Sequence, residues 1–195
     1  HASRPVLKAM KRGGDARGYR RMIERARKRV PDLTLRTTFI VGFPGEGEAE
    51  FEQLLDFVRE IRFDHLGAFT YSWQEENPGA ELGDPIAEVV KQRRHRLLME
   101  AQQGISLDVN SGLVGQTLPA LVSGPLPEME LLLEARLQRQ APEIDGRLLI
   151  NDGTAAAGSL VEVEITEAHP YDLVGRLVSV SIPGESVAVH LPVIG

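Results

Sequence analysis

The residues best suited to bind a ligand form a short glycine-rich turn, Gly42-Phe43-Pro44-Gly45-Glu46. An apolar segment with the composition of a buried strand precedes the turn, and a segment with helical periodicity follows it. Ligands of βα proteins bind at the carboxyl ends of parallel strands, where backbone N–H groups and a helix N-terminus are available. The turn therefore predicts either a ligand site or a plain strand-to-helix connection. It is not a phosphate loop, because no Lys-Ser/Thr pair follows it.

Three further residues are candidates for the same site. Arg36 lies inside the predicted strand, where a charge is costly unless it faces a polar lumen or pairs with a carboxylate. Tyr71 and Ser72 end the next predicted strand on the same rim as Gly42. We expect them either to line a pocket or to pack within the sheet.

Several kinds of chemistry are excluded or unsupported. The chain has no cysteine, which excludes within it disulfides, a thiolate nucleophile and Cys-based iron–sulfur or zinc sites. The five histidines show no metal-ligand spacing, and sequence distance alone identifies no Ser/His/Asp triad. The segment 141–146 places two acids, Glu143 and Asp145, in a turn between predicted strands, and a hairpin loop is its simplest interpretation.

The elements that position the glycine-rich turn alternate between helix and strand. Apolar spacing of three and four predicts helices from Tyr19 to Pro31 and from Phe51 to Ile61, with strands at 33–42 and 65–72. This order is typical of βα units around a parallel sheet, but two strands cannot close a barrel. A third helix is predicted from an N-cap at Asp84 and Pro85 to about residue 107. Its predicted apolar face carries Ile86, Val89, Val90, Leu97, Leu98, Ala101 and Ile105.

Beyond Gly112 the apolar period changes to two. Val161, Val163 and Ile165 alternate with polar residues, which is typical of a strand with one buried face. Apolar runs near 117–122, 129–137, 147–150, 159–165 and 173–180, with another at 186–191, are separated by turn residues. They predict a small antiparallel β-barrel. We therefore predict an α/β domain at 1–111, which ends in the long helix, and a barrel domain at 112–195.

Charge is distributed unevenly along the 195 residues. The net charge is −6, yet residues 1–36 carry twelve Lys or Arg and three acids, a local balance of +9. This asymmetry predicts two surfaces with different partners, unless the basic residues are simply the solvated side of a helix. No apolar segment is long enough to cross a bilayer, and the first residues lack signal-peptide order. We expect a cytoplasmic protein without membrane contacts.

Several motifs together resemble the C-terminal part of the radical S-adenosylmethionine (SAM) methylthiotransferases. The similarity is most specific in 35–46 (LRTTFIVGFPGE) and is supported by 1–3 (HAS), 6–12 (VLKAMKR) and 69–72 (FTYS). Further along, the chain is similar to the branch that modifies an aspartate of the twelfth small-subunit ribosomal protein. That similarity rests on 141–146 (APEIDG), 165–168 (ITEA) and 171–173 (YDL).

The resemblance implies a fold and a set of cofactors. It implies part of a radical-SAM (β/α) barrel followed by a TRAM domain, a small OB-like barrel. In the family, a 5′-deoxyadenosyl radical from SAM abstracts hydrogen from the aspartate β-carbon before a methylthio group is installed. The resemblance also implies two 4Fe-4S clusters and an electron donor. The cluster ligands must lie outside this cysteine-free chain, so we expect the chain alone to be inactive.

The resemblance also places binding residues, but no catalytic residue and no metal ligand, in this chain. The residues expected on the SAM side of the barrel are Arg36, Thr38, Ile40, Gly42, Phe43, Glu46 and Tyr71. In the barrel domain we predict that Arg136, Glu143 and Asp145 contact the substrate.

The charge of the barrel helps to choose a substrate. Residues 112–180 hold ten acids and four bases. An acidic surface repels RNA and attracts a basic ribosomal protein, so RNA binding by the barrel is not expected. Two alternatives remain open: a tRNA methylthiotransferase, and a noncatalytic binding module.

Overall fold

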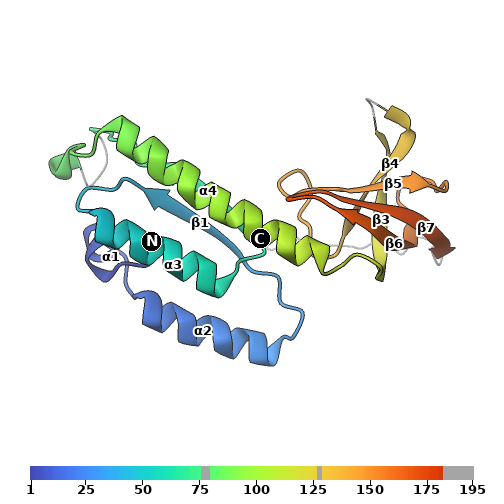
Figure 1. The fold of residues 1–195 in the computed structure, drawn as a ribbon, viewed down its shortest axis with the longest axis horizontal. Helices are drawn as coiled ribbons and strands as arrows, with labels where there is room; N and C mark the ends of the chain where they lie inside the picture. Colours follow the sequence, from blue (N-terminus) through green and yellow to red (C-terminus); the bar gives the residue numbers. More distant parts are fainter. Residues whose placement is uncertain (76–79, 127–128, 182–195) are drawn as a thin grey trace, which may run out of the picture. The chain divides into compact units, whose positions relative to one another are not determined.

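The computed structural model describes residues 1–75, 80–126 and 129–181. The chain divides into two compact units, residues 1–109 and residues 110–195 (Figure 1). Among the described residues, no helix is both long and apolar enough to cross a membrane. The run at 186–191 that was predicted to resemble a strand lies outside the described residues.

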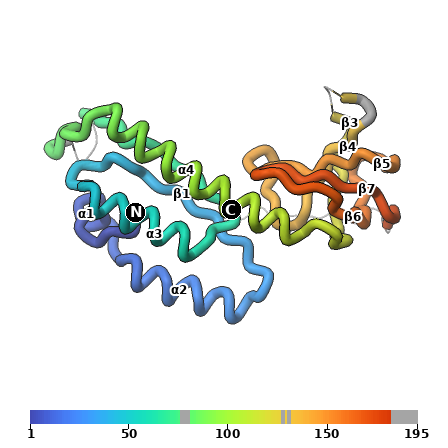
Figure 2. The backbone as a smooth tube through the Cα atoms, viewed as in Figure 1, coloured from blue at the N-terminus to red at the C-terminus, as the bar shows by residue number. Residues whose placement is uncertain are grey.

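The first unit combines two parallel strands with helices, and Figure 2 traces its backbone. Strand β1 pairs with β2 in register from Arg36↔His65 to Val41↔Thr70. The elements in chain order are α1 (Arg4–Ala9), α2 (Ala16–Arg29), β1 (Arg36–Val41), α3 (Glu48–Ile61), β2 (His65–Thr70), a 3-10 turn (Ala80–Leu82) and α4 (Glu88–Ser111). The predicted alternation of helix and strand is confirmed, and α1 is an addition that the periodicity did not predict.

Helix α2 begins at a side-chain cap. Asp15 Oδ1 accepts a hydrogen bond of 2.7 Å from the Gly18 N–H, which satisfies one of the free donors of the first turn. This hydrogen bond is the main reason that the pKa of the Asp15 carboxyl is lowered, and the nearby Arg17, Arg4 and Arg21 act in the same direction. The helix buries Ala16 and Ile23 and leaves its basic side in solvent.

Helix α4 differs from its prediction in its start and in its buried face. It begins at Glu88, so the predicted N-cap at Asp84-Pro85 is wrong. The Asp84 carboxylate instead accepts a hydrogen bond of 2.6 Å from Lys91 Nζ. Val89, predicted on the apolar face, is 75% exposed. The face that is buried carries Lys91, Arg94, Leu98, Gln102, Ile105 and Ser106.

The second unit is a closed five-stranded barrel. Its strands are β3 (Thr117–Leu126), β4 (Met129–Leu137), β5 (Leu148–Asp152), β6 (Leu160–Ala168) and β7 (Leu173–Ser181), in the order β3-β4-β5-β7-β6. The five predicted strands at 117–180 are confirmed. Four of the pairings are antiparallel, whereas β5 and β7 pair in parallel because β6 carries the chain back before β7 begins. Val161, Val163 and Ile165 point into the barrel core, as their alternation predicts.

Candidate functional site

One face of the β1–β2 sheet is open. Phe39 and Val41 are buried in the core, whereas Arg36, Thr38 and Ile40 alternate with them and are exposed. Ile40 is paired with Phe69 of β2, which is 65% exposed. Because paired residues of a parallel sheet point to the same side, these side chains form one surface. It offers apolar contacts beside a hydroxyl and a cation, which suits an amphipathic ligand.

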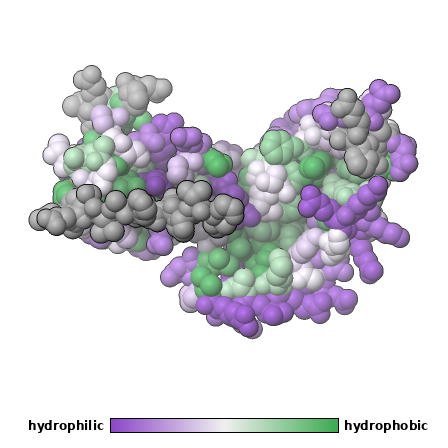
Figure 3. Space-filling view, turned by 180° about the vertical axis from the view of Figure 1, so that it is seen from behind, coloured by the Kyte–Doolittle hydropathy of each residue, from purple (hydrophilic) through white to green (hydrophobic). Residues whose placement is uncertain are grey.

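A hollow of about 400 Å³ extends along β1. Its walls include Arg36, Thr38 and Ile40 from the strand and Tyr19 and Met22 from α2. Figure 3 shows exposed hydrophobic surface, in green, on the body formed by the first unit. Arg36 lies on this exposed side, so its charge is not in a packed core.

The glycine-rich turn forms the rim at the end of the open face. The Phe43 and Tyr71 rings meet edge to face with centroids 5.0 Å apart, and Tyr71 N–H donates to the Val41 carbonyl at 2.8 Å. The ends of both strands are therefore joined at the rim. Gly42 has a φ of +76°, a conformation that suits glycine. Ser72 beside Tyr71 is exposed.

A buried lysine, Lys91, donates a hydrogen bond to the main chain of this rim. Lys91 is 2% exposed, and its Nζ donates to the Tyr71 carbonyl at 3.0 Å and to Asp84. Its Nζ also lies 5.6 Å from the centre of the Tyr71 ring. A Cβ added to Gly42 would lie 2.4 Å from Lys91 Cγ. The glycine is therefore needed both for its backbone conformation and for the close approach of the lysine stem.

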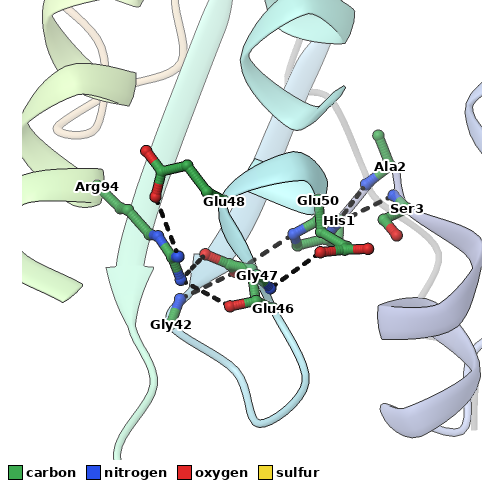
Figure 4. Close-up of polar contacts among 9 residues, drawn as sticks. All are labelled: His1, Ala2, Ser3, Gly42, Glu46, Gly47, Glu48, Glu50 and Arg94. Carbon is green, nitrogen blue, oxygen red and sulfur yellow. Dashed lines mark hydrogen bonds and ion pairs between the residues drawn. The ribbon is translucent and has the colours of Figure 1, made fainter. Parts of the chain in front are cut away.

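Glu46 is buried in a polar cluster and does not lie on the open face (Figure 4). Its Oε2 accepts the Gly42 N–H at 2.9 Å, and its Oε1 accepts Arg94 Nη1 at 3.0 Å. His1 Nε2 lies 3.2 Å from Oε2. His1 Nδ1 accepts the N–H groups of Ala2 and Ser3 at 2.9 and 3.0 Å, so in the neutral ring the proton is on Nε2, facing the carboxylate. Glu46 thus contacts three segments of the chain: the N-terminal residue His1, Gly42 of the glycine-rich turn, and Arg94 of α4.

Sequence reasoning missed His1, Lys91 and Arg94. The partners of these residues lie far away in the sequence, so no local motif marks them. One signal was available: Lys91, Arg94 and Gln102 share helical spacing with Leu98 and Ile105, and polar residues on a buried face need partners. Gln102 has one as well, because its Nε2 donates to the Phe63 carbonyl at 2.9 Å.

The three predicted substrate residues of the barrel differ in their surroundings. Asp145 Oδ2 accepts the Ala141 N–H at 2.7 Å, so this carboxylate helps to hold the turn between β4 and β5. Glu143 is exposed, with a φ of +64°. Arg136 is partly exposed on β4, between the buried Ala135 and Leu137. The structure therefore places Glu143 and Arg136 at the barrel surface and gives Asp145 a structural contact.

Ion pairs neutralise part of the acidic barrel surface. Glu164 accepts two hydrogen bonds from the Arg176 guanidinium, at 2.7 and 3.0 Å, and these bonds raise the pKa of Arg176. Glu134 lies 3.4 Å from Arg147. Across residues 1–75, 80–126 and 129–181 no three His, Asp or Glu residues gather as a metal site would require.

Comparison with known proteins shows which proteins these elements are similar to. Residues 1–58 match the Radical SAM superfamily, and residues 114–178 match the TRAM domain. The chain is 49% identical over 179 residues to the ribosomal protein uS12 methylthiotransferase RimO of Anaeromyxobacter sp. (strain K), which covers 92% of this chain and 38% of the relative. It is 48% identical to the RimO protein of Syntrophotalea carbinolica, covering 93% and 40%, and 44% identical to that of Geobacter sulfurreducens, covering 92% and 40%.

These findings support a RimO-like methylthiotransferase fragment, and the family resemblance predicted from the sequence is confirmed. The chain spans about two fifths of the length of the curated relatives it matches. The radical SAM match implies SAM and iron–sulfur chemistry, although this chain has no cysteine to ligate a cluster.

Proposed function

We propose that this chain is the part of a methylthiotransferase that helps to bind SAM and guides the substrate protein. The parent enzyme would add a methylthio group to the β-carbon of an aspartate in ribosomal protein uS12. The observation that carries the proposal is the open β1–β2 face, which ends at the Gly42 rim in a chain similar to RimO proteins. An electron donor and two 4Fe-4S clusters, with ligands elsewhere in the parent protein, belong to the same proposal.

The residues on the open face fit SAM, which combines an apolar adenine with polar and charged groups. Ile40 offers apolar surface and Thr38 a hydroxyl, and the half-buried side chains of Phe43 and Tyr71 stand at the rim. When bound, SAM supplies the radical chemistry of the reaction. The residues of this chain do not fit a cluster, because thiolate ligands are required and there are none.

The contribution of this chain is to bind and orient. Arg36, Thr38 and Ile40 would contact SAM directly, and Tyr71 with Phe43 would limit its position at the rim. Glu46 would act as a positioning residue, because its carboxylate oxygens are already engaged by Gly42 N–H and Arg94. Lys91 would hold the rim rigid from behind. Rigid walls matter in such an enzyme, since water and stray hydrogen donors must be kept from a radical.

The experiment that tests the proposal measures the mass of uS12. The full-length parent, with its clusters and a reductant, is incubated with uS12 and SAM. We expect uS12 to gain the mass of one methylthio group on an aspartate. A modified adenosine in tRNA, with uS12 unchanged, would support the alternative RNA-modifying activity. If the cluster-loaded protein modifies neither uS12 nor tRNA, the result would support the other alternative, a noncatalytic binding module.

The open face makes a sharper prediction about SAM binding. In the full-length protein, Ile40→Asp should weaken SAM binding at least tenfold, or about 1.4 kcal/mol, because an unpaired carboxylate would be desolvated against the ligand. Val89→Asp is the matched control, since Val89 is also a β-branched residue of the first unit and is 75% exposed. Equilibrium dialysis with labelled SAM measures both affinities. Equal affinities in the two variants would contradict the assignment of this face.

We further propose that the acidic barrel docks the basic ribosomal protein. Glu143 and Glu162 have no ion-pair partner among the described residues, so their charge is available to a partner. Reversing both to Lys should weaken uS12 binding about tenfold at low salt, with little difference left at 0.5 M salt. Asp145 is unsuitable for this test, because its replacement would also break the turn.

The control for the barrel carries the same charge change in the first unit. Glu75→Lys with Glu81→Lys alters two exposed acids there. Fluorescence anisotropy with labelled uS12 should separate the two double variants. If the control weakens binding as much as the barrel variant does, net charge is responsible and the barrel is not the docking surface.

A further inference from the structure

Helix α2 carries a row of basic side chains along its solvent side. Ala16 and Ile23 turn the opposite side into the core. We call the exposed residues Arg17, Arg21, Arg25, Lys28 and Arg29 the basic stripe. Its four arginines are spaced by four residues, which places them on one side of the helix at intervals of about 6 Å along the axis. In Figure 3 a hydrophilic rim, in purple, follows the lower edge of the first unit, where α2 lies in Figure 1.

The cations of residues 37–109 are paired, whereas among the described residues the stripe, like Arg4, Lys8, Lys11 and Arg12, has no ion-pair partner. Every Lys and Arg between residues 37 and 109 has a carboxylate within 4.0 Å. These residues are Arg59, Arg62, Lys91, Arg93, Arg94 and Arg96. Within α2, Arg20 pairs with Glu60, and Arg27 donates to the Arg62 carbonyl at 3.1 Å. None of the five stripe residues forms an ion pair with any residue the structure describes.

The arrangement is also unfavourable for the isolated helix. Like charges four residues apart destabilise a helix, whereas a Glu in such a position before an Arg or Lys stabilises it. Arg17, Arg21, Arg25 and Arg29 are separated by that spacing. Glu24, the only acid within the helix, lies four residues before Lys28 and so offsets only part of this repulsion. A surface with alternating positive and negative side chains would keep the helix equally well solvated. An anionic partner explains why the charges accumulate on one side.

The chemistry of the stripe favours RNA over other anionic partners. Phosphates are bound by arginine through paired N–H donors, and a nucleic-acid strand supplies them at regular intervals. A membrane-surface helix must insert an apolar face, but α2 turns Ala16 and Ile23 into the core and presents charged side chains on its opposite side. A protein partner would normally need buried apolar anchors in addition to charge.

We propose that the basic stripe of α2 binds the phosphate backbone of RNA. The stripe shares no residue with the open face of β1–β2 or with the acidic barrel, for which RNA binding is not expected. The proposal does not depend on methylthio transfer. RNA binding can therefore fail while the proposed function stands, and the reverse also holds.

The test uses the full-length protein and a fluorescein-labelled poly(U) RNA of 20 nucleotides. Fluorescence anisotropy is measured from 50 to 200 mM KCl. Arg21→Gln with Arg25→Gln should weaken binding roughly 20-fold near 0.1 M salt. It should also lower the slope of log affinity against log salt by about 1.4, because each lost phosphate contact lowers it by about 0.7. Glutamine has a helix propensity close to that of arginine, so α2 should remain folded.

Two control variants isolate the stripe. Arg59→Gln with Arg96→Gln removes the same charge from side chains that are 60% and 67% exposed and already paired, and it should bind RNA like the parent. Arg21→Lys with Arg25→Lys keeps the charge and should keep the salt slope. Parent-like RNA binding by the Arg21→Gln, Arg25→Gln variant would overturn the proposal.

Competing anions test the choice of RNA. Polyglutamate at equal charge concentration should not displace the labelled RNA, and phosphatidylserine vesicles should not bind. Displacement by polyglutamate, or vesicle binding without RNA binding, would overturn the assignment to RNA. Methylthio transfer to isolated uS12 should be unchanged in the Arg21→Gln, Arg25→Gln variant, because neither residue contacts the open face.

Discussion

Arg94→Met should destabilise the first unit by about 3–5 kcal/mol. Arg94 is 4% exposed, and its Nη1 donates to both the main-chain carbonyl and the Oε1 atom of Glu46, at 2.9 and 3.0 Å. Methionine fills similar space without a charge. The Glu46 carboxylate, 3% exposed, would then be buried with the Gly42 N–H and His1 alone. The cost arises from this uncompensated charge rather than from lost packing.

Urea unfolding followed by tryptophan fluorescence measures this loss. Trp73 is the only tryptophan of the chain and lies in the first unit, so its signal reports that unit selectively. Arg93→Met is the matched control: Arg93 is 49% exposed and pairs with Glu48 at the surface, so its loss should cost less than about 1 kcal/mol.

A double variant separates charge from packing. Glu46→Gln with Arg94→Met removes both charges, so it should be more stable than the sum of the two single losses predicts. If Arg94→Met proves too unstable to fold, this double variant remains measurable. If Arg94→Met and Arg93→Met lower the free energy of unfolding equally, the buried cluster around Glu46 does not stabilise the first unit more than a surface ion pair does.

Local periodicity was enough to predict much of the fold. The apolar residues spaced by three and four from Tyr19 to Val30 and from Phe51 to Ile61 predict helices close to α2 and α3. The alternation of apolar and polar residues in β6 predicts its buried face. In each case the signal and its cause lie within the same element. The open face could be predicted in the same way, because residues 36, 38 and 40 must share one side of a strand.

The errors arose where contacts distant in sequence decide the structure. The buried face of α4 includes Lys91 and Arg94, which hydropathy places in solvent. Both are buried because Tyr71, Asp84 and Glu46 come from other segments to satisfy them. The same contacts explain why Asp84 does not cap the helix, and why the Glu46 carboxylate is buried.

Gly146→Ala should destabilise the barrel by at least about 3 kcal/mol. A Cβ at this position would lie 1.8 Å from the Tyr171 carbonyl oxygen and 3.0 Å from Asp172 Oδ1, and the first distance is one that real Cβ atoms essentially never show. The obstacle is backbone, which cannot rotate away. It also lies beside the parallel β5–β7 pairing, where Asp172 Oδ1 accepts the Arg147 N–H at 2.9 Å and Leu173 N–H donates to the Arg147 carbonyl.

Gly158→Ala distinguishes this steric effect from a general cost of replacing glycine in the barrel. Gly158 has a φ of +82° and no atom within 4 Å of an added Cβ, so its replacement should cost only the backbone strain, roughly 1–2 kcal/mol. Urea unfolding by far-ultraviolet circular dichroism measures both losses, and the Trp73 transition should stay unchanged because that residue lies in the other unit. A Gly146→Ala loss no larger than that of Gly158→Ala would mean that the β5–β7 pairing can open by more than 1 Å at little cost. Sequence alone predicts a turn glycine at 146; only the closure of the barrel, which brings Tyr171 against it, makes hydrogen the only side chain that fits.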